Sequence, residues 1–90
     1  MQKMSPYLAE FIGTLFFLFV ILFTGQALPI GLALMIVILI LGKFSGGHFN
    51  PAVTIMMVVA NKLSSIDAAP YIIAQVLGGL VALFIYNRTK

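Results

Sequence analysis

One short stretch of this sequence carries hydrogen-bonding chemistry between long apolar runs. Gly46, Gly47 and His48 lead into Asn50 and Pro51. The Asn50 amide can donate hydrogen bonds, and the carbonyl groups of the preceding residues can accept them. This chemistry suits the passage of a neutral polar molecule. The sequence shows no nucleophile–base pair, carboxylate pair, phosphate-binding loop or redox motif, so we do not expect an enzyme.

The ten residues from Pro51 to Ala60 predict a helix that is too short to cross a bilayer. Asn50 is a favoured N-cap residue, and Pro51 suits the first helical position. Ten residues extend about 15 Å, roughly half of a 30 Å hydrocarbon core. The first turn, which includes Ala52, then lies near the midplane with N–H groups that lack intrahelical partners. Lipid cannot satisfy these groups, so we expect this tip to face a polar cavity.

Three longer apolar runs predict helices over about 6–24, 27–43 and 67–87. With their flanking residues, all three can span a membrane. Hydrophobic residues make up 62% of the chain and charged residues only 8%, which indicates that a lipid bilayer surrounds it. We therefore expect an all-α, multi-pass integral membrane protein. Residues 1–90 would form one domain of three transmembrane helices and one re-entrant half-helix over 51–60.

The titratable residues argue against several other classes of protein. The net charge of +3 comes from scattered Lys and Arg residues, so we expect no nucleic-acid partner. His48 is the only His and there is no Cys, so we expect neither a metal nor a cofactor. His48 could line a pore, sense pH or be tied by loop hydrogen bonds. Glu10 is unusual for a signal peptide, so we expect the first run to be retained.

Polar and small residues within the apolar runs predict contacts between helices. An acid such as Glu10 inside a membrane is a functional candidate, either as a structural acceptor or as a proton relay. Gln75 is expected to hydrogen-bond it from another helix. Small residues recur every four positions in the last run and form a ridge that lets another helix approach closely. These residues are Ala74, Gly78 and Ala82.

The run Ser45–Thr54, with the sequence SGGHFNPAVT, resembles the first pore loop of the major intrinsic protein family, the aquaporins and glycerol facilitators. Ala9–Thr14 resembles the first helix of that family, Ile30–Ala33 the second and Tyr71–Gly79 the third. The resemblance covers nearly the whole chain in order. It implies a passive channel for water or small neutral solutes such as glycerol.

The resemblance also implies roles for individual residues. Glu10 would hold the pore loop by accepting backbone N–H groups, with Gln75 in support. Ile30 would lie at the narrow filter, where the family often has an aromatic residue or His. We expect Gly13 and Gly31, in the matching helix segments, to serve helix packing. The residues expected to line the pore are Asn50, Pro51, Ala52, His48, Gly46, Gly47 and Ile30.

Members of this family have two such halves, inverted in the membrane, and this sequence contains one. It has no second Asn-Pro-Ala, so we expect conduction to require the assembly of two halves. The expected topology puts Lys3, Lys43 and Lys62 on one side of the membrane and Arg88 and Lys90 on the other. This near balance suggests that copies insert both ways up and pair as an antiparallel homodimer. A separately encoded complementary half is the alternative partner.

A second class of function is also compatible with the sequence. The chain could be a non-conducting structural or regulatory membrane subunit that packs against a partner through the ridge of small residues. It could also be a truncated remnant of a channel. Swelling of proteoliposomes would separate a channel from both alternatives.

Overall fold

The computed structural model describes residues 3–90, which form four helices and contain no strand. In chain order these are α1 (Pro6–Thr24), α2 (Ala27–Ser45), α3 (Pro51–Val59) and α4 (Ser65–Thr89). Helices α1, α2 and α4 are long and apolar enough to cross a membrane. The expected all-α, multi-pass membrane architecture is therefore confirmed. Helix α2 continues to Ser45 rather than ending at 43, and α4 covers 65–89 rather than 67–87.

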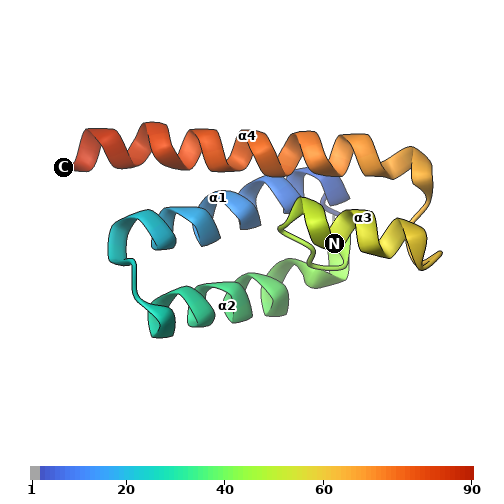
Figure 1. The fold of residues 1–90 in the computed structure, drawn as a ribbon, viewed down its shortest axis with the longest axis horizontal. Helices are drawn as coiled ribbons and strands as arrows, with labels where there is room; N and C mark the ends of the chain where they lie inside the picture. Colours follow the sequence, from blue (N-terminus) through green and yellow to red (C-terminus); the bar gives the residue numbers. More distant parts are fainter. Residues whose placement is uncertain (1–2) are drawn as a thin grey trace.

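Local sequence signals set the helix ends. The Ser5 hydroxyl accepts the first free N–H groups of α1, and Pro6 occupies its first turn. Gly25 ends α1 with a φ of 60°, and Gly46 ends α2 with a φ of 91°. Both values lie in the left-handed region that glycine adopts without a steric penalty. The cap at Gly25 turns the chain sharply, so α2 runs antiparallel to α1 (Figure 1).

Helix α1 lies between α2 and α4, and α3 packs against α4 (Figure 1). Helix α3 begins near the middle of α4 and runs back toward the end of the molecule where α4 starts (Figure 1). Its nine residues extend only about 14 Å. The loop before α3 leads the chain toward the middle of the molecule, and α3 returns it to the side from which it came (Figure 1). The C-terminus lies at the opposite end (Figure 1).

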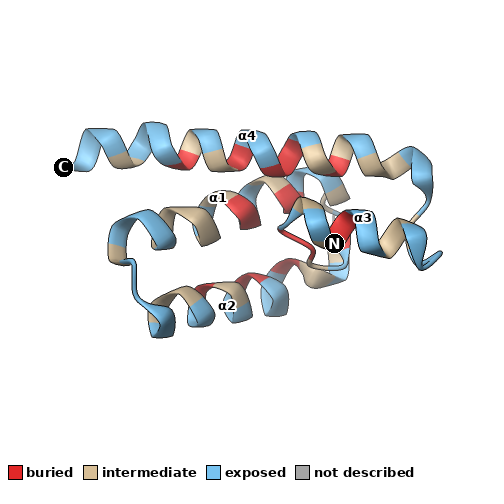
Figure 2. Ribbon diagram, viewed as in Figure 1, coloured by how far each residue is buried: buried red, intermediate tan, exposed pale blue. Residues whose placement is uncertain are grey.

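Buried residues face the interior between the helices, and the outward faces are exposed (Figure 2). The core cluster consists of Ala9, Val37, Leu41 and Phe49. Many large apolar side chains lie on the outside. Leu39, for example, is 73% exposed. A surface of this kind is typical of a protein that is surrounded by lipid.

The ridge of small residues on α4 packs within the chain. A Cβ atom at Gly78 would lie 2.7 Å from the Phe11 carbonyl oxygen, so α1 approaches α4 closely at this point. Ala74 and Ala82, on the same face of α4, are also buried. The expectation that this ridge is free to bind a partner is therefore wrong, because α1 already covers it.

Gly13 and Gly31 were also expected to serve helix packing, but only one of them is buried. Gly13 is buried, and a Cβ atom there would overlap the Phe49 ring. Gly31 is exposed, and a Cβ atom there would meet nothing within 4 Å. Within this chain Gly31 therefore has no packing role, because its face of α2 points away from α1.

Candidate functional site: the half-helix tip and its supporting loop

The Glu10 side chain lies at the centre of the loop that leads into α3. It is fully buried, and both of its oxygens accept hydrogen bonds. Oε2 accepts from the Ser45 hydroxyl at 2.7 Å and from the His48 N–H at 3.1 Å. Oε1 accepts from the Phe49 N–H at 2.7 Å and from Gln75 Nε2 at 2.8 Å. Four neutral donors from three parts of the chain thus hold one carboxylate, which ties the loop to α1 and α4.

A second set of hydrogen bonds joins the loop to α3 and α4 through Thr54. Its hydroxyl accepts from Gln75 Nε2 at 2.8 Å and lies 2.8 Å from His48 Nδ1. Which of the two groups donates in the contact between Thr54 and His48 depends on the His48 tautomer. His48 is only 7% exposed. Of the roles open to it from sequence, these contacts fit a side chain that is tied within the loop.

Aromatic side chains brace the loop on the side of α4. The Tyr71 hydroxyl donates to the Ser45 carbonyl at 2.7 Å, and its ring lies 5.0 Å from the His48 ring. Tyr7 packs edge-on against Tyr71 and donates to Asp67 Oδ1 at 2.6 Å. The starts of α1 and α4 are therefore joined to each other and to the end of α2.

Three of the four residues before Asn50 have positive φ values, which shape the backbone of the loop. Gly46 and Gly47 have φ values of 91° and 72°, and Phe49 has a φ of 52°, which is uncommon for a residue with a side chain. The Phe49 ring is buried against Gly13, and its N–H is bound by Glu10. These contacts hold Phe49 in a strained conformation, and Asn50 follows it directly.

Asn50 caps α3 at the point where the half-helix begins. Its Oδ1 accepts from the Ala52 N–H at 2.8 Å, and the residue is exposed. Its Nδ2 group is left to donate to another molecule. Pro51 has no N–H and the Ala52 N–H is bound by Asn50, so the first turn of α3 has few free donors. The Asn50 amide is consequently the main polar group at the tip.

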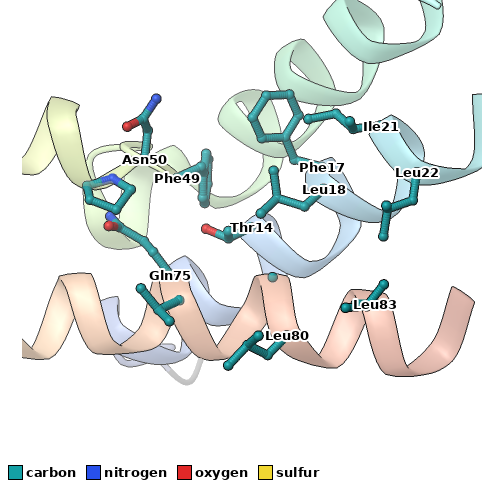
Figure 3. Close-up of a pocket in the computed structure, with 13 residues that line it drawn as sticks. Thr14, Phe17, Leu18, Ile21, Leu22, Phe49, Asn50, Gln75, Leu80 and Leu83 are labelled. Atoms are coloured by element: carbon teal, nitrogen blue, oxygen red, sulfur yellow. The ribbon is translucent and has the colours of Figure 1, made fainter. Parts of the chain in front are cut away.

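A groove of about 670 Å³ runs from this tip along α1 and α4 (Figure 3). Asn50 and Gln75 lie at one end of it, and apolar side chains that include Leu22 and Leu83 line the other end (Figure 3). The groove therefore combines a polar end at the depth of the half-helix tip with a long apolar wall.

The structure separates the residues that were expected to line a pore. Only Asn50 and Pro51 among them border the groove. Ile30 is half-buried on α2 and lies outside it. The remaining four do not border the groove either, although they belong to the loop or to the first turn of α3. They are Gly46, Gly47, His48 and Ala52.

Several contributors to the site were missed in the sequence. Phe49, Thr54 and Tyr71 were not singled out, although the first two lie within the motif that identified the loop. Thr14 reaches the groove from α1 and was also not singled out, whereas Gln75, which was predicted to bond Glu10, does so and also borders the groove. Their positions depend on how α1 and α4 face each other, which no local pattern reveals.

A re-entrant half-helix supported by a buried carboxylate, between three membrane-spanning helices, defines half of an aquaporin-like fold. The Major intrinsic protein family model matches residues 1–89. The chain belongs to this family, whose members are membrane channels rather than enzymes.

The curated relatives carry the names of water and glycerol channels. The chain is 44% identical to glycerol uptake facilitator protein-like 6 of Lactiplantibacillus plantarum, with 88% of this chain and 41% of the relative covered. It is 45% identical to aquaporin Z of Photorhabdus laumondii over 67% of this chain and 26% of the relative. It is 38% identical to mouse aquaporin-8 over 89% of this chain and 35% of the relative. The chain thus spans less than half the length of these relatives. No solved structure matches it.

Proposed function

We propose that this chain is half of a passive channel for water or small neutral solutes such as glycerol, and that it conducts when two halves assemble. The observation that carries this proposal is the exposed Asn50 amide at the tip of a half-helix that ends part-way through the membrane. The names of the relatives, which include both aquaporins and a glycerol uptake facilitator, support this class of solute.

The arrangement favours neutral molecules for two reasons. The Asn50 Nδ2 group can donate a hydrogen bond to the oxygen of water or of an alcohol. The N-terminus of α3 carries about half a positive charge, which repels cations when it faces a pore. Gly46 is exposed and Gly47 half-buried, so their carbonyl groups can serve as further acceptors along the path. The apolar wall of the groove offers a moving solute few competing hydrogen bonds.

A single chain cannot enclose a pore, because the groove is open along its length. The partner half would be either a second copy, inserted in the opposite orientation, or a separately encoded chain. The alternative of a non-conducting subunit that binds through the small-residue ridge loses its basis, since α1 covers that ridge.

Osmotic shrinkage of proteoliposomes tests the proposal. The protein should accelerate shrinkage in a sucrose gradient, and in a glycerol gradient should speed the re-swelling that follows. Asn50→Asp keeps an N-cap acceptor but removes the Nδ2 donor and adds a negative charge, so it should abolish most of the gain. Val59→Asp places the same charge at the other end of α3, where the side chain is 77% exposed, and should retain it. Shrinkage no faster than in empty vesicles, with folded protein present, would contradict channel function.

A further inference from the structure

A second groove lies between α1 and α4, away from the α3 tip. It has a volume of about 630 Å³ and shares no lining residue with the groove that Asn50 borders. Its lining residues fall within 7–11 on α1 and 69–77 on α4, and Tyr7 is the only polar residue among them. The groove is therefore apolar along its length and has a single hydroxyl group, at the start of α1.

This groove has the depth of one leaflet of a bilayer. It starts near the end of the molecule where α1 and α4 both begin (Figure 1). From Ala69 to Leu77 it follows α4 for about 12 Å, and one half of a hydrocarbon core measures about 15 Å. A transmembrane helix of a partner would contact α4 across the whole core. The short groove instead matches an acyl chain from one leaflet.

A carboxylate oxygen is available at the mouth of this groove. The Tyr7 hydroxyl donates to Asp67 Oδ1 at 2.6 Å, which places Asp67 next to the groove lining. Asp67 is half-buried, and no described residue donates to its Oδ2 atom. Glu10 is the only other acidic residue of the sequence and is fully buried. Asp67 is therefore the one acidic side chain that a cationic group from outside the chain can reach.

We propose that this groove binds one phospholipid with a primary amine head group, of the phosphatidylethanolamine class. One acyl chain lies along the apolar wall, and the ammonium group donates to Asp67 Oδ2. This charge-assisted hydrogen bond requires an N–H donor, which an ethanolamine head group has and a choline head group lacks. The phosphate of the same lipid lies near the N-terminus of α4, which begins at Ser65 and favours an anion. An apolar groove and a charge of the matching sign thus meet in one site.

Native mass spectrometry of the full chain in detergent micelles tests the head group. Phosphatidylethanolamine, phosphatidylcholine and phosphatidylglycerol with the same acyl chains are titrated separately, and each binding event is resolved. The first phosphatidylethanolamine should bind about fivefold more tightly than either other lipid, which is the upper range for a partly exposed ion pair. Equal binding of the three lipids, or tightest binding of phosphatidylglycerol, would overturn the proposal.

Two substitutions separate the charge of Asp67 from its hydrogen bond with Tyr7. Asp67→Asn removes the charge and keeps an acceptor for the Tyr7 hydroxyl, so the preference for phosphatidylethanolamine should disappear. Tyr7→Phe removes the same hydrogen bond and keeps the charge, so the preference should persist. A preference that survives Asp67→Asn, or one that is lost in Tyr7→Phe, would contradict the contact with Oδ2.

The acyl-chain part of the site has a test of its own. Ala69→Phe places a ring in the groove from an exposed position, so the preference should be lost although Asp67 is intact. Ala27→Phe makes the same change at an exposed position of α2, outside the groove, and should retain the preference. An undiminished preference in Ala69→Phe would show that the lipid does not lie in this groove. None of these measurements requires conduction, so their outcome is independent of the proposed channel.

Discussion

The two sides of the α3 tip differ in how completely their polar groups are satisfied. On the loop side, one carboxylate accepts four hydrogen bonds and a threonine hydroxyl links a histidine to a glutamine. On the groove side, two buried polar atoms have no partner within residues 3–90. The chain thus pairs the polar groups of the loop that holds Asn50, and it leaves two polar atoms on the groove side unpaired. Stability should depend on the first region, and association on the second.

Removal of the Glu10 carboxylate should produce the largest effect on stability. Glu10→Ala leaves two backbone N–H groups and two side-chain donors without their acceptor in a buried position. Hydrogen bonds to charged groups contribute about 1.5–3 kcal/mol each, so the loss of all four should total about 6 kcal/mol or more. Unfolding by SDS titration in mixed micelles measures it.

A truncation in the groove is the matched control for this experiment. Leu80 lines the groove and is 58% exposed, so Leu80→Ala should cost less than about 1 kcal/mol in the monomer. Similar losses for Glu10→Ala and Leu80→Ala would mean that the two regions do not differ as the structure indicates.

Glycine substitutions should produce intermediate effects that depend on the helix face. Gly78→Ala forces α1 and α4 apart, because the new Cβ atom meets backbone, and should destabilise by about 1–3 kcal/mol. Gly13→Ala displaces the Phe49 ring and should cost a similar amount. Gly31→Ala meets no neighbour and should be neutral or stabilise by up to about 1 kcal/mol. The same SDS titration ranks the three, and a loss for Gly31→Ala would show an unrecognised contact on α2.

A pair of buried threonines, one on each side of the tip, gives the finest comparison of the two regions. Thr54→Val removes a hydroxyl that is bonded to Gln75 and His48, and should cost about 1–3 kcal/mol. Thr14→Val removes a hydroxyl with no partner, and should leave the monomer unchanged or slightly more stable. Equal losses in detergent would show that Thr14 Oγ1 has a partner in the folded chain.

Sequence reasoning succeeded where the signal was local. Asn50 and Pro51 mark the start of α3 through capping preferences, and the apolar runs located the three spans because length and composition suffice for that. The contacts of Glu10 with the loop agree with what the family resemblance implied.

The errors concern which face of a helix meets which neighbour. Gly31 and Gly78 look alike in sequence, yet one is exposed and the other is pressed against α1. The positive φ of Phe49 follows from its burial against Gly13, which lies in a distant part of the sequence. Such relations are set by the tertiary packing of α1 against α4, and helix periodicity alone does not determine them.

The bond between Glu10 and Gln75 has a consequence for biogenesis, because 65 positions separate the two residues. Synthesis delivers α1 to the membrane well before α4 exists. Three of its four donors come from residues 45–49 and the fourth from α4, so α1 is made before any of them, and a charged group in hydrocarbon is costly. Glu10 must therefore stay accessible to water until the loop and α4 are in place. The loop and α3 therefore reach their final positions late in membrane insertion.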